Sequence, residues 1–382
     1  MSLPLASIDL SDAVEYHYGD FPPEKLDLEL LLKPITDATA SLSRYDEMLR
    51  NMLNSEVLLG PLRRRDAVVS SRMEGTISTL DEILQLEADE DAGDRDARRN
   101  ARSETVEVFL YARALKAAQD RLSEGASISD WLVRGAHQTL LAFGRGAQKS
   151  PGQYKTEQNY IGERGRNAKV SFIPVSHDHL QQGMDTLFEF IDADVHIPIL
   201  RTALAHIEFE ALHPFEDGNG RVGRMLITLL LWHYGLISQP HFFVSGYFEQ
   251  NKDEYIERMR RVSSHHEWSE WCAFFLGGLE AQAEENIKIA EAIQTLYADM
   301  KDRFQQVLSS QWSNHALDFI FANPVFRNNR FTSASGIPAP TAHRFTNKLQ
   351  KSRFIQELQP ASGRRAALYS FEPLLRIVRE SS

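Results

Sequence analysis

The residues best suited to chemistry lie in one stretch of twelve, from His213 to Arg224, which reads HPFEDGNGRVGR. Two glycines flank Asn219 at the point where the apolar, helix-forming run 222–234 begins. Backbone amides freed by Gly218 and Gly220 can converge at a helix N-terminus, whose partial positive charge favours a phosphate group. The stretch therefore predicts a nucleotide-phosphate site.

The side chains of this stretch supply the other parts of such a site. Arg221 and Arg224 stand three residues apart, so on a helix they share a face and can bind neighbouring phosphates. Asp217 offers hard oxygen donors that suit Mg²⁺. His213 can take a proton from an attacking hydroxyl, because an imidazole titrates near neutral pH. A base, a metal ligand and counter-charges thus lie within one short segment.

The stretch matches the Fic family motif, HxFx(D/E)GNGRxxR, at His213, Phe215, Asp217, Gly218, Asn219, Gly220, Arg221 and Arg224. On these residues the chain resembles Fic proteins. The resemblance implies transfer of AMP from ATP to a Ser, Thr or Tyr hydroxyl of a target protein or of the chain itself. It implies that His213 is the general base, that Phe215 anchors the loop in the core and that Asp217 binds Mg²⁺. The two motif glycines, Asn219 and the two arginines would hold the phosphates of ATP.

A second segment, Ser70-Ser71-Arg72-Met73-Glu74-Gly75, resembles the family's inhibitory motif, (S/T)xxxE(G/N). On a helix, Ser70 and Glu74 share a face and could both point into the nucleotide pocket. Glu74 is then a candidate ion-pair partner of Arg224, in competition with the γ-phosphate of ATP. We therefore expect autoinhibition, with a solvated glutamate at a helix end as the alternative.

A predicted β-hairpin is the third element of the site. Its arms are 154–162 and 170–175, with a polar tip at 162–169, and it occupies the place of the family's flap. The free edge of a flap can pair with an extended target segment. Tyr247 and Tyr255 follow the catalytic helix, and by analogy one or both pack on adenine, with core packing as the alternative.

Composition and charge restrict the class of protein. The chain has 382 residues, of which 42% are hydrophobic and 25% charged, and these values are typical of a soluble globular protein. No apolar run approaches the roughly 18–20 residues of a membrane span. The single cysteine, Cys272, excludes an intramolecular disulfide, and the histidines lack the spacing of a zinc site. With no secretory signal at the N-terminus, we expect a cytoplasmic protein without membrane contact.

The chain is expected to be mainly α-helical and to have four parts. These are an N-terminal helical region with the inhibitory helix (1–104), a Fic-type core with one hairpin (105–279), a linker helix (280–310) and a winged-helix-like domain (311–382). Pro34 is expected to mark a break or a helix start, and Gly60-Pro61 is expected to interrupt the N-terminal helices. The segment 87–104 is expected to be an exposed linker or a solvated helix start.

The charge is unevenly distributed, and this leaves a rival function open. Residues 311–382 carry ten Lys/Arg against four Asp/Glu, a net charge of +6, which leaves −17 for the rest of a chain whose total is −11. The segment 339–351 could be a recognition helix and Arg364-Arg365 a wing, so a DNA-binding regulator is one alternative.

The same catalytic site leaves a second alternative, since it could remove AMP or transfer another phosphate-containing group. The expected partners are ATP and a protein with a modifiable hydroxyl. Binding to DNA through the C-terminal module and homo-oligomerisation stay open.

Overall fold

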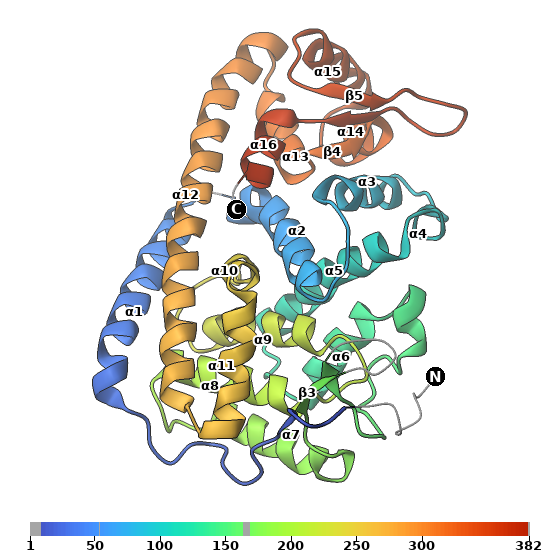
Figure 1. Ribbon diagram of the computed structural model, residues 1–382. Helices are drawn as coiled ribbons and strands as arrows, with labels where there is room; N and C mark the ends of the chain where they lie inside the picture. The colour runs from blue at the N-terminus through green and yellow to red at the C-terminus, as the bar shows by residue number, and fades with distance from the viewer. Residues whose placement is uncertain (1–8, 53, 163–168, 381–382) are drawn as a thin grey trace. The chain divides into compact units, whose positions relative to one another are not determined.

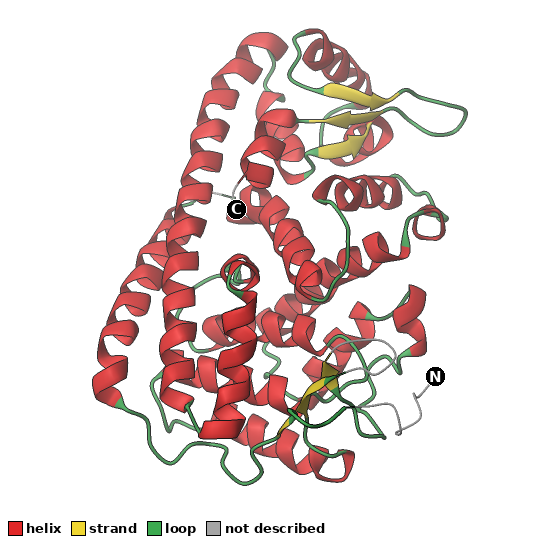
Figure 2. Cartoon of the chain, in the orientation of Figure 1, coloured by secondary structure: helices red, strands yellow, loops and turns green. Residues whose placement is uncertain are grey.

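Helices make up most of the protein, and the strands of its described residues form two small sheets (Figure 2). The computed structural model describes residues 9–52, 54–162 and 169–380. The prediction of a mainly α-helical fold with small β elements is confirmed. Within these residues, no helix is both long enough and apolar enough to cross a membrane.

The chain forms two compact units, each built from two separate segments. Unit 1 comprises Met1–Asp46 and Arg113–Ala283, and unit 2 comprises Glu47–Ala112 and Glu284–Ser382. The boundaries fall inside three helices, α1 (Leu28–Asn51), α5 (Ser103–Ser123) and α12 (Trp268–Leu308). Residues 47–112 thus share a unit with the C-terminal segment. The four-part division made from the sequence stays a prediction.

Unit 1 is organised around the buried helix α8. This helix packs on both α7 and α9, which flank it in the chain. Nearly every residue of α8 is buried, and the same is true of α9 up to Leu231. The helices that lie wholly within the unit are α6 (Asp130–Leu140), the 3₁₀ helix η2 (Gly144–Gln148), α7 (His177–Asp192), α8 (Pro198–Leu212), α9 (Asn219–His233), α10 (Ser245–Gln250) and α11 (Lys252–His265) (Figure 1).

The sheet of unit 1 contains the predicted hairpin and one strand that the sequence did not indicate. Strand β2 (Ile161–Gly162) pairs antiparallel with β3 (Val170–Ile173), and β1 (Val14–Glu15) pairs parallel with the other edge of β3. The strand order is β1-β3-β2, so the open edge of the hairpin is the β2 edge. Most of the predicted tip (162–169), namely 163–168, lies outside the described residues.

Unit 2 joins the N-terminal helices to the C-terminal elements. It contains α2 (Ser55–Met73), α3 (Leu80–Asp91) and α4 (Ala97–Asn100). Helix α2 packs on α13 and α16, and α3 packs on β4. A second sheet of order β4-β6-β5 is antiparallel throughout. The C-terminal elements are α13 (Ser313–Ala322), β4 (Val325–Arg327), α14 (Asn328–Ala334), α15 (Ala339–Lys351), β5 (Gln356–Gln359), β6 (Leu368–Ser370) and α16 (Glu372–Glu380).

Buried ionic contacts hold α3 against the C-terminal elements. Arg327 Nε donates to Asp89 Oδ1 at 2.6 Å, and both side chains are almost fully buried. Arg365, which is half-exposed, donates to the other oxygen of Asp89 at 2.8 Å and lies 3.4 Å from Asp94. Acidic residues that the sequence indicated as part of a linker therefore belong to a packed helix and its C-terminal turn.

Two predicted interruptions of the N-terminal helices are wrong. Helix α1 continues through Pro34, and α2 continues through Gly60 and Pro61. Both Gly60 and Pro61 are buried, together with their neighbours Leu59 and Leu62. Packing along this helix outweighs the local breaking tendency of Gly-Pro.

Candidate active site

The loop between α8 and α9 carries the catalytic motif, and two left-handed residues shape it. His213 directly follows α8 with φ 47° and ψ 61°, and Gly218 directly precedes α9 with φ 82° and ψ 5°. Glycine adopts this conformation freely, whereas for a residue with a side chain it costs about 1–2 kcal/mol. The predicted base therefore lies at a strained backbone position, which is a common property of functional sites.

The backbone angle favours a glycine at position 218, and the space around it is tight as well. A Cβ atom there would lie 3.2 Å from Leu140 Cδ2 and 3.6 Å from His137 Cδ2. Gly220 lies in the first turn of α9, where backbone N–H groups have no partner within the helix. The two glycines thus lie at a helix N-terminus, and phosphate binding there stays a prediction.

Asn219 closes the loop on itself. The backbone N–H of Phe215 donates to Asn219 Oδ1, and Asn219 Nδ2 donates to the Phe215 carbonyl oxygen, both at 2.8 Å. The Phe215 ring is fully buried. In this structure the Asn219 amide shapes the loop backbone, and its contact with phosphate stays a prediction.

His137, which the sequence analysis missed, holds the loop from α6. The backbone N–H of Gly152 donates to His137 Nδ1 at 2.9 Å, so the ring proton is on Nε2, which donates to the Asp217 carbonyl oxygen at 2.9 Å. The ring also stacks on Phe215, with centroids 3.7 Å apart and planes 6° apart. Burial lowers the pKa of His137 to about 4, so the ring is neutral at physiological pH.

Asp217 is the candidate Mg²⁺ ligand, and its carboxylate is partly exposed. Its Oδ1 accepts a hydrogen bond from the Gly218 N–H at 2.8 Å and lies 3.6 Å from Arg221 Nη2. No cluster of three or more His, Cys, Asp or Glu side chains suited to a metal occurs among the described residues. A lone carboxylate still fits Mg²⁺, which commonly takes one or two carboxylates and completes its shell with phosphate oxygens and water.

Arg221 and Arg224 are both almost fully buried on α9. The positive charge of Arg224 acts on His206 of α8. Burial first, and then the charge of Arg224, lowers the pKa of His206 to about 3. Two buried guanidinium groups beside a helix N-terminus suit an anionic ligand with several phosphates.

The two tyrosines proposed for adenine occupy different environments. Tyr255 is buried, and its hydroxyl donates to His206 Nε2 at 2.7 Å, while His206 Nδ1 donates to the Gly223 carbonyl oxygen at 3.1 Å. Tyr247 is half-buried on α10 and packs beside Phe274. Tyr247 is thus the more accessible of the two, and an adenine contact of either stays a prediction.

The inhibitory motif lies at the end of α2, in unit 2. Ser70 is fully buried on the helix, and Glu74 is the exposed residue that follows the last residue, Met73. Gly75 is left-handed with φ 82° and ends the helix. The catalytic motif belongs to unit 1, so the predicted pairing of Glu74 with Arg224 stays a prediction.

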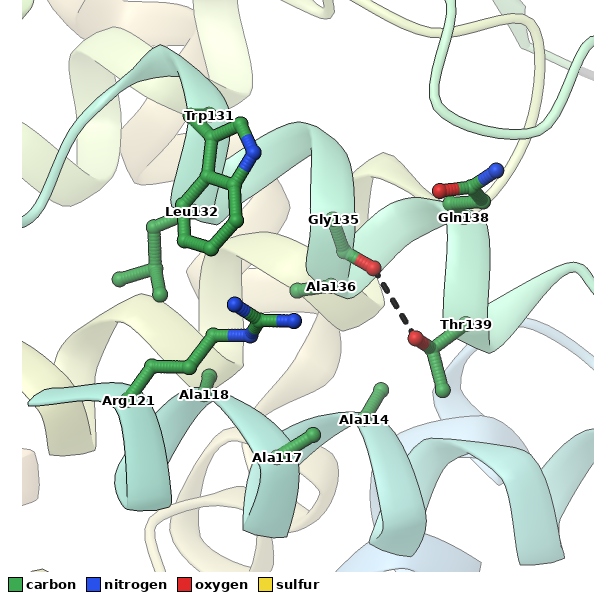
Figure 3. A pocket seen from close by; sticks show the side chains of 10 residues that line it. All are labelled: Ala114, Ala117, Ala118, Arg121, Trp131, Leu132, Gly135, Ala136, Gln138 and Thr139. Carbon is green, nitrogen blue, oxygen red and sulfur yellow. Dashed lines mark hydrogen bonds between the residues drawn. The ribbon is translucent and has the colours of Figure 1, made fainter.

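A pocket of about 160 Å³ lies elsewhere in unit 1, between α5 and α6 (Figure 3). Its opposite walls carry Arg121 and Trp131, and the guanidinium carbon lies 4.3 Å from the Trp131 ring centroid. The pocket is otherwise lined mainly by small residues, and none of the motif residues contributes to it. It is therefore separate from the predicted nucleotide site.

Comparison with family models identifies the chain's relatives. The Fic/DOC family N-terminal model matches residues 32–120, and the Fic/DOC family model matches residues 127–231. The chain contains a Fic/DOC family domain. The second match includes the whole catalytic motif, so the resemblance inferred from that motif is confirmed at the level of the domain. The first match covers the segment 70–75, whose inhibitory role stays a prediction.

Curated relatives of this Fic domain are named as adenylyltransferases. The chain is 31% identical over 130 residues to protein adenylyltransferase fic-1 of Caenorhabditis elegans, a match covering 33% of this chain and 22% of that protein. It is 36% identical over 64 residues to a probable protein adenylyltransferase of Aquifex aeolicus, covering 17% of this chain and 18% of that protein. The chain thus spans only about a fifth of these two relatives.

A solved structure shares the fold over nearly the whole chain. A Fic family protein from Desulfovibrio desulfuricans G20 superposes with a TM-score of 0.58 at 18% identity, covering 92% of this chain and 98% of that one. The match extends well beyond the Fic domain. At this identity it supports the fold alone.

Proposed function

We propose that this protein transfers AMP from ATP, with Mg²⁺, to a Ser, Thr or Tyr hydroxyl of a target protein or of itself. The observation that carries the proposal is the complete eight-residue motif on a loop that ends at the N-terminus of a buried helix. The names of the curated relatives support the same activity class.

The reaction follows from the roles of the loop residues. The target hydroxyl gives its proton to His213 while its oxygen bonds to the α-phosphorus of ATP. The bond from that phosphorus to the bridging oxygen breaks, and pyrophosphate leaves. Arg221, Arg224 and the amides at the start of α9 bind the phosphates and hold the α-phosphorus in line with the hydroxyl. Mg²⁺ held by Asp217 would offset the charge of the departing pyrophosphate.

Regulation by the end of α2 is the second part of the proposal. Glu74 would pair with Arg224 and displace the γ-phosphate, so that ATP binds in a pose unsuited to in-line attack. Ser70 and Gly75 complete this motif. The burial of Ser70 and the helix end at Gly75 support a fixed geometry for this segment. The open β2 edge of the flap would align the target segment.

The test uses the purified full chain with α-labelled ATP and Mg²⁺, alone and in cell lysate. We expect label on protein with wild type, more label with Glu74→Gly, and none above background with His213→Ala. Replacing the base should lower the rate by roughly 10²–10⁴-fold. Labelling by folded His213→Ala at the wild-type rate would contradict the proposal.

Removal of AMP, or transfer of another phosphate-containing group, is the alternative chemistry at the same site. Mass spectrometry of the labelled protein identifies the group transferred. Protein that already carries AMP, freed of ATP and given fresh enzyme, distinguishes AMP removal from AMP transfer. If wild type removes the AMP and Glu74→Gly does not, the enzyme catalyses removal, and Glu74 orients the attacking water.

The C-terminal elements support a second candidate function. Their order of helix, strand, two helices and two strands, with sheet order β4-β6-β5, is that of a winged helix, and we propose this identity for 311–382. Helix α15 exposes His343, Arg344 and Lys351, and Arg364 is exposed on the wing. This positively charged surface would suit the phosphates of duplex DNA. Arg365 already pairs with Asp89, so Arg364 is the arginine of the wing that we expect to contact DNA. Salt-dependent binding of duplex DNA, weakened by Arg344→Ala, tests this candidate.

A further inference from the structure

Donors from a segment about 55 residues upstream hold the backbone of the catalytic loop. The Lys155 backbone N–H donates to the Pro214 carbonyl oxygen at 2.8 Å, and Lys155 Nζ donates to the Leu212 carbonyl oxygen at 3.0 Å. Asn159 Nδ2 donates to the carbonyl oxygens of His213 and Phe215, at 3.0 and 3.1 Å. Four consecutive carbonyl groups, 212–215, are thus engaged by just two residues.

These two residues also bond to each other. Lys155 Nζ donates to Asn159 Oδ1 at 2.8 Å, and this orients the amide so that its NH₂ group faces the loop. The ammonium lies at the C-terminal end of α8, where carbonyl groups lack partners within the helix and the helix dipole favours a positive charge. Asn159 stands two residues before β2, so the same pair joins the flap to the loop.

The chemistry of Lys155 indicates a role beyond stability. Its side chain is buried, and among the described residues its ammonium contacts only neutral acceptors. Burial lowers the pKa of Lys155 to about 7. Burying an ammonium group without an opposite charge costs free energy, which its contacts with neutral acceptors offset only in part. Groups of this kind concentrate at functional sites.

We propose that Lys155 and Asn159 are positioning residues for the transfer reaction, which fix carbonyl groups 212–215 and thereby place the His213 ring relative to the flap and the start of α9. The inference rests on the proposed function for its activity readout. Because the two residues touch neither the phosphates nor the hydroxyl in this scheme, their loss should affect turnover and leave ATP binding almost unchanged.

The test compares two variants, each of which removes one set of donors, with a matched control. Lys155→Met removes the ammonium, and Asn159→Asp keeps the acceptor for Lys155 while presenting a carboxylate oxygen to the two loop carbonyl groups. Gln158→Leu is the control, because Gln158 Nε2 donates to the carbonyl oxygens of Pro174 and Asn159 and to no loop carbonyl.

The activity readouts are the maximal rate of self-modification with α-labelled ATP and the ATP concentration for half of that rate. We expect both variants to lower the maximal rate roughly 10- to 100-fold. The ATP concentration that gives half of the maximal rate should change by less than about threefold. This is the pattern expected when a lost interaction affects turnover but not substrate binding. The double variant should lose less than the product of the two single losses, since the residues act as one unit. Gln158→Leu should match wild type.

Hydrogen exchange of the peptide spanning 210–224 gives a readout that is independent of activity. Exchange should become faster there in Lys155→Met and Asn159→Asp and stay at the wild-type rate in Gln158→Leu. If wild type transfers no AMP but exchange changes in this way, the function is wrong and the positioning role stands. If either folded variant transfers AMP at the wild-type rate with unchanged exchange, or Gln158→Leu loses as much rate as they do, the inference is overturned. Should Lys155→Met fail to fold, Asn159→Asp alone decides.

Discussion

Replacing His213 by glycine and by alanine separates the chemistry of this residue from its backbone strain. Both substitutions remove the imidazole and all its contacts, so the difference between them reflects the backbone alone. Wild-type His213 has φ 47° and ψ 61°. Glycine removes the left-handed cost of about 1–2 kcal/mol that alanine retains. Glycine also adds about 0.4–1 kcal/mol of unfolded-state entropy that opposes folding. His213→Gly should therefore be more stable than His213→Ala by up to about 1.6 kcal/mol, with a midpoint of about 0.8 kcal/mol.

Urea unfolding followed by tryptophan fluorescence measures this difference. Four of the five tryptophans, at positions 131, 232, 268 and 271, belong to unit 1, so the signal reports mainly on the unit that contains His213. Both variants should lose AMP transfer to the same extent. The reasoning is refuted if His213→Gly unfolds at a lower urea concentration than His213→Ala, because the left-handed geometry would then cost less than the unfolded-state entropy that glycine adds.

Three further predictions concern metal, pH and the packing of unit 2. AMP transfer should stop in excess chelator, and Asp217→Ala should lose it even at saturating Mg²⁺; full transfer under either condition would exclude this metal role. Burial lowers the pKa of His206 to about 3. Between pH 6.5 and pH 3 the unfolded state therefore binds a proton that the folded state does not. The free energy of unfolding should fall as the pH drops through this range. The contribution is about 1.4 kcal/mol per pH unit, and His206→Gln should flatten the urea-midpoint profile over this range. Asp89→Ala should destabilise unit 2 by about 3–5 kcal/mol, because the buried Arg327 guanidinium loses its carboxylate. The half-exposed Arg365→Gln should cost no more than about 1 kcal/mol in the same thermal unfolding measurement.

The catalytic motif could be predicted from the sequence because its members are neighbours in the chain. A glycine beside an asparagine at the start of an apolar run indicates a left-handed turn into a helix, and the structure places Gly218 and α9 accordingly. The helical character of most of the chain followed from apolar spacing in the same way. Sequence patterns were therefore sufficient where a structural feature lies within one continuous segment.

Local signals failed where distant packing decides the structure. The breaking tendency of Gly60-Pro61 predicted a helix end, but burial of this segment in unit 2 keeps α2 continuous. Strand β1 has only two residues and pairs with β3 more than 150 residues away, so its sequence carries no strand pattern. The acidic run after residue 87 suggested a linker because its partners Arg327 and Arg365 lie far along the chain.

The residues that hold the loop could not be found from the sequence, for a chemical reason. His137, Lys155 and Asn159 donate to backbone carbonyl groups, and every residue of the loop has a carbonyl group whatever its side chain. No residue of the motif therefore indicates its donor. The one available signal was weak: Lys155 and Asn159 stand four residues apart within the first arm of the predicted flap.

These donors and the strain at His213 should be coupled, and the coupling can be measured. An unfavourable backbone conformation persists only where the surroundings impose it. Asn159 bonds the carbonyl groups on both sides of Pro214 and so helps to hold His213 in the left-handed region. With Asn159→Asp, the loop can relax, and the stability advantage of Gly over Ala at 213 should fall clearly below the value of about 0.8 kcal/mol expected with Asn159 in place. A double-mutant cycle on urea midpoints gives this value. An unchanged difference would show that the strain is imposed by other contacts of the loop, such as the bond from His137 to Asp217.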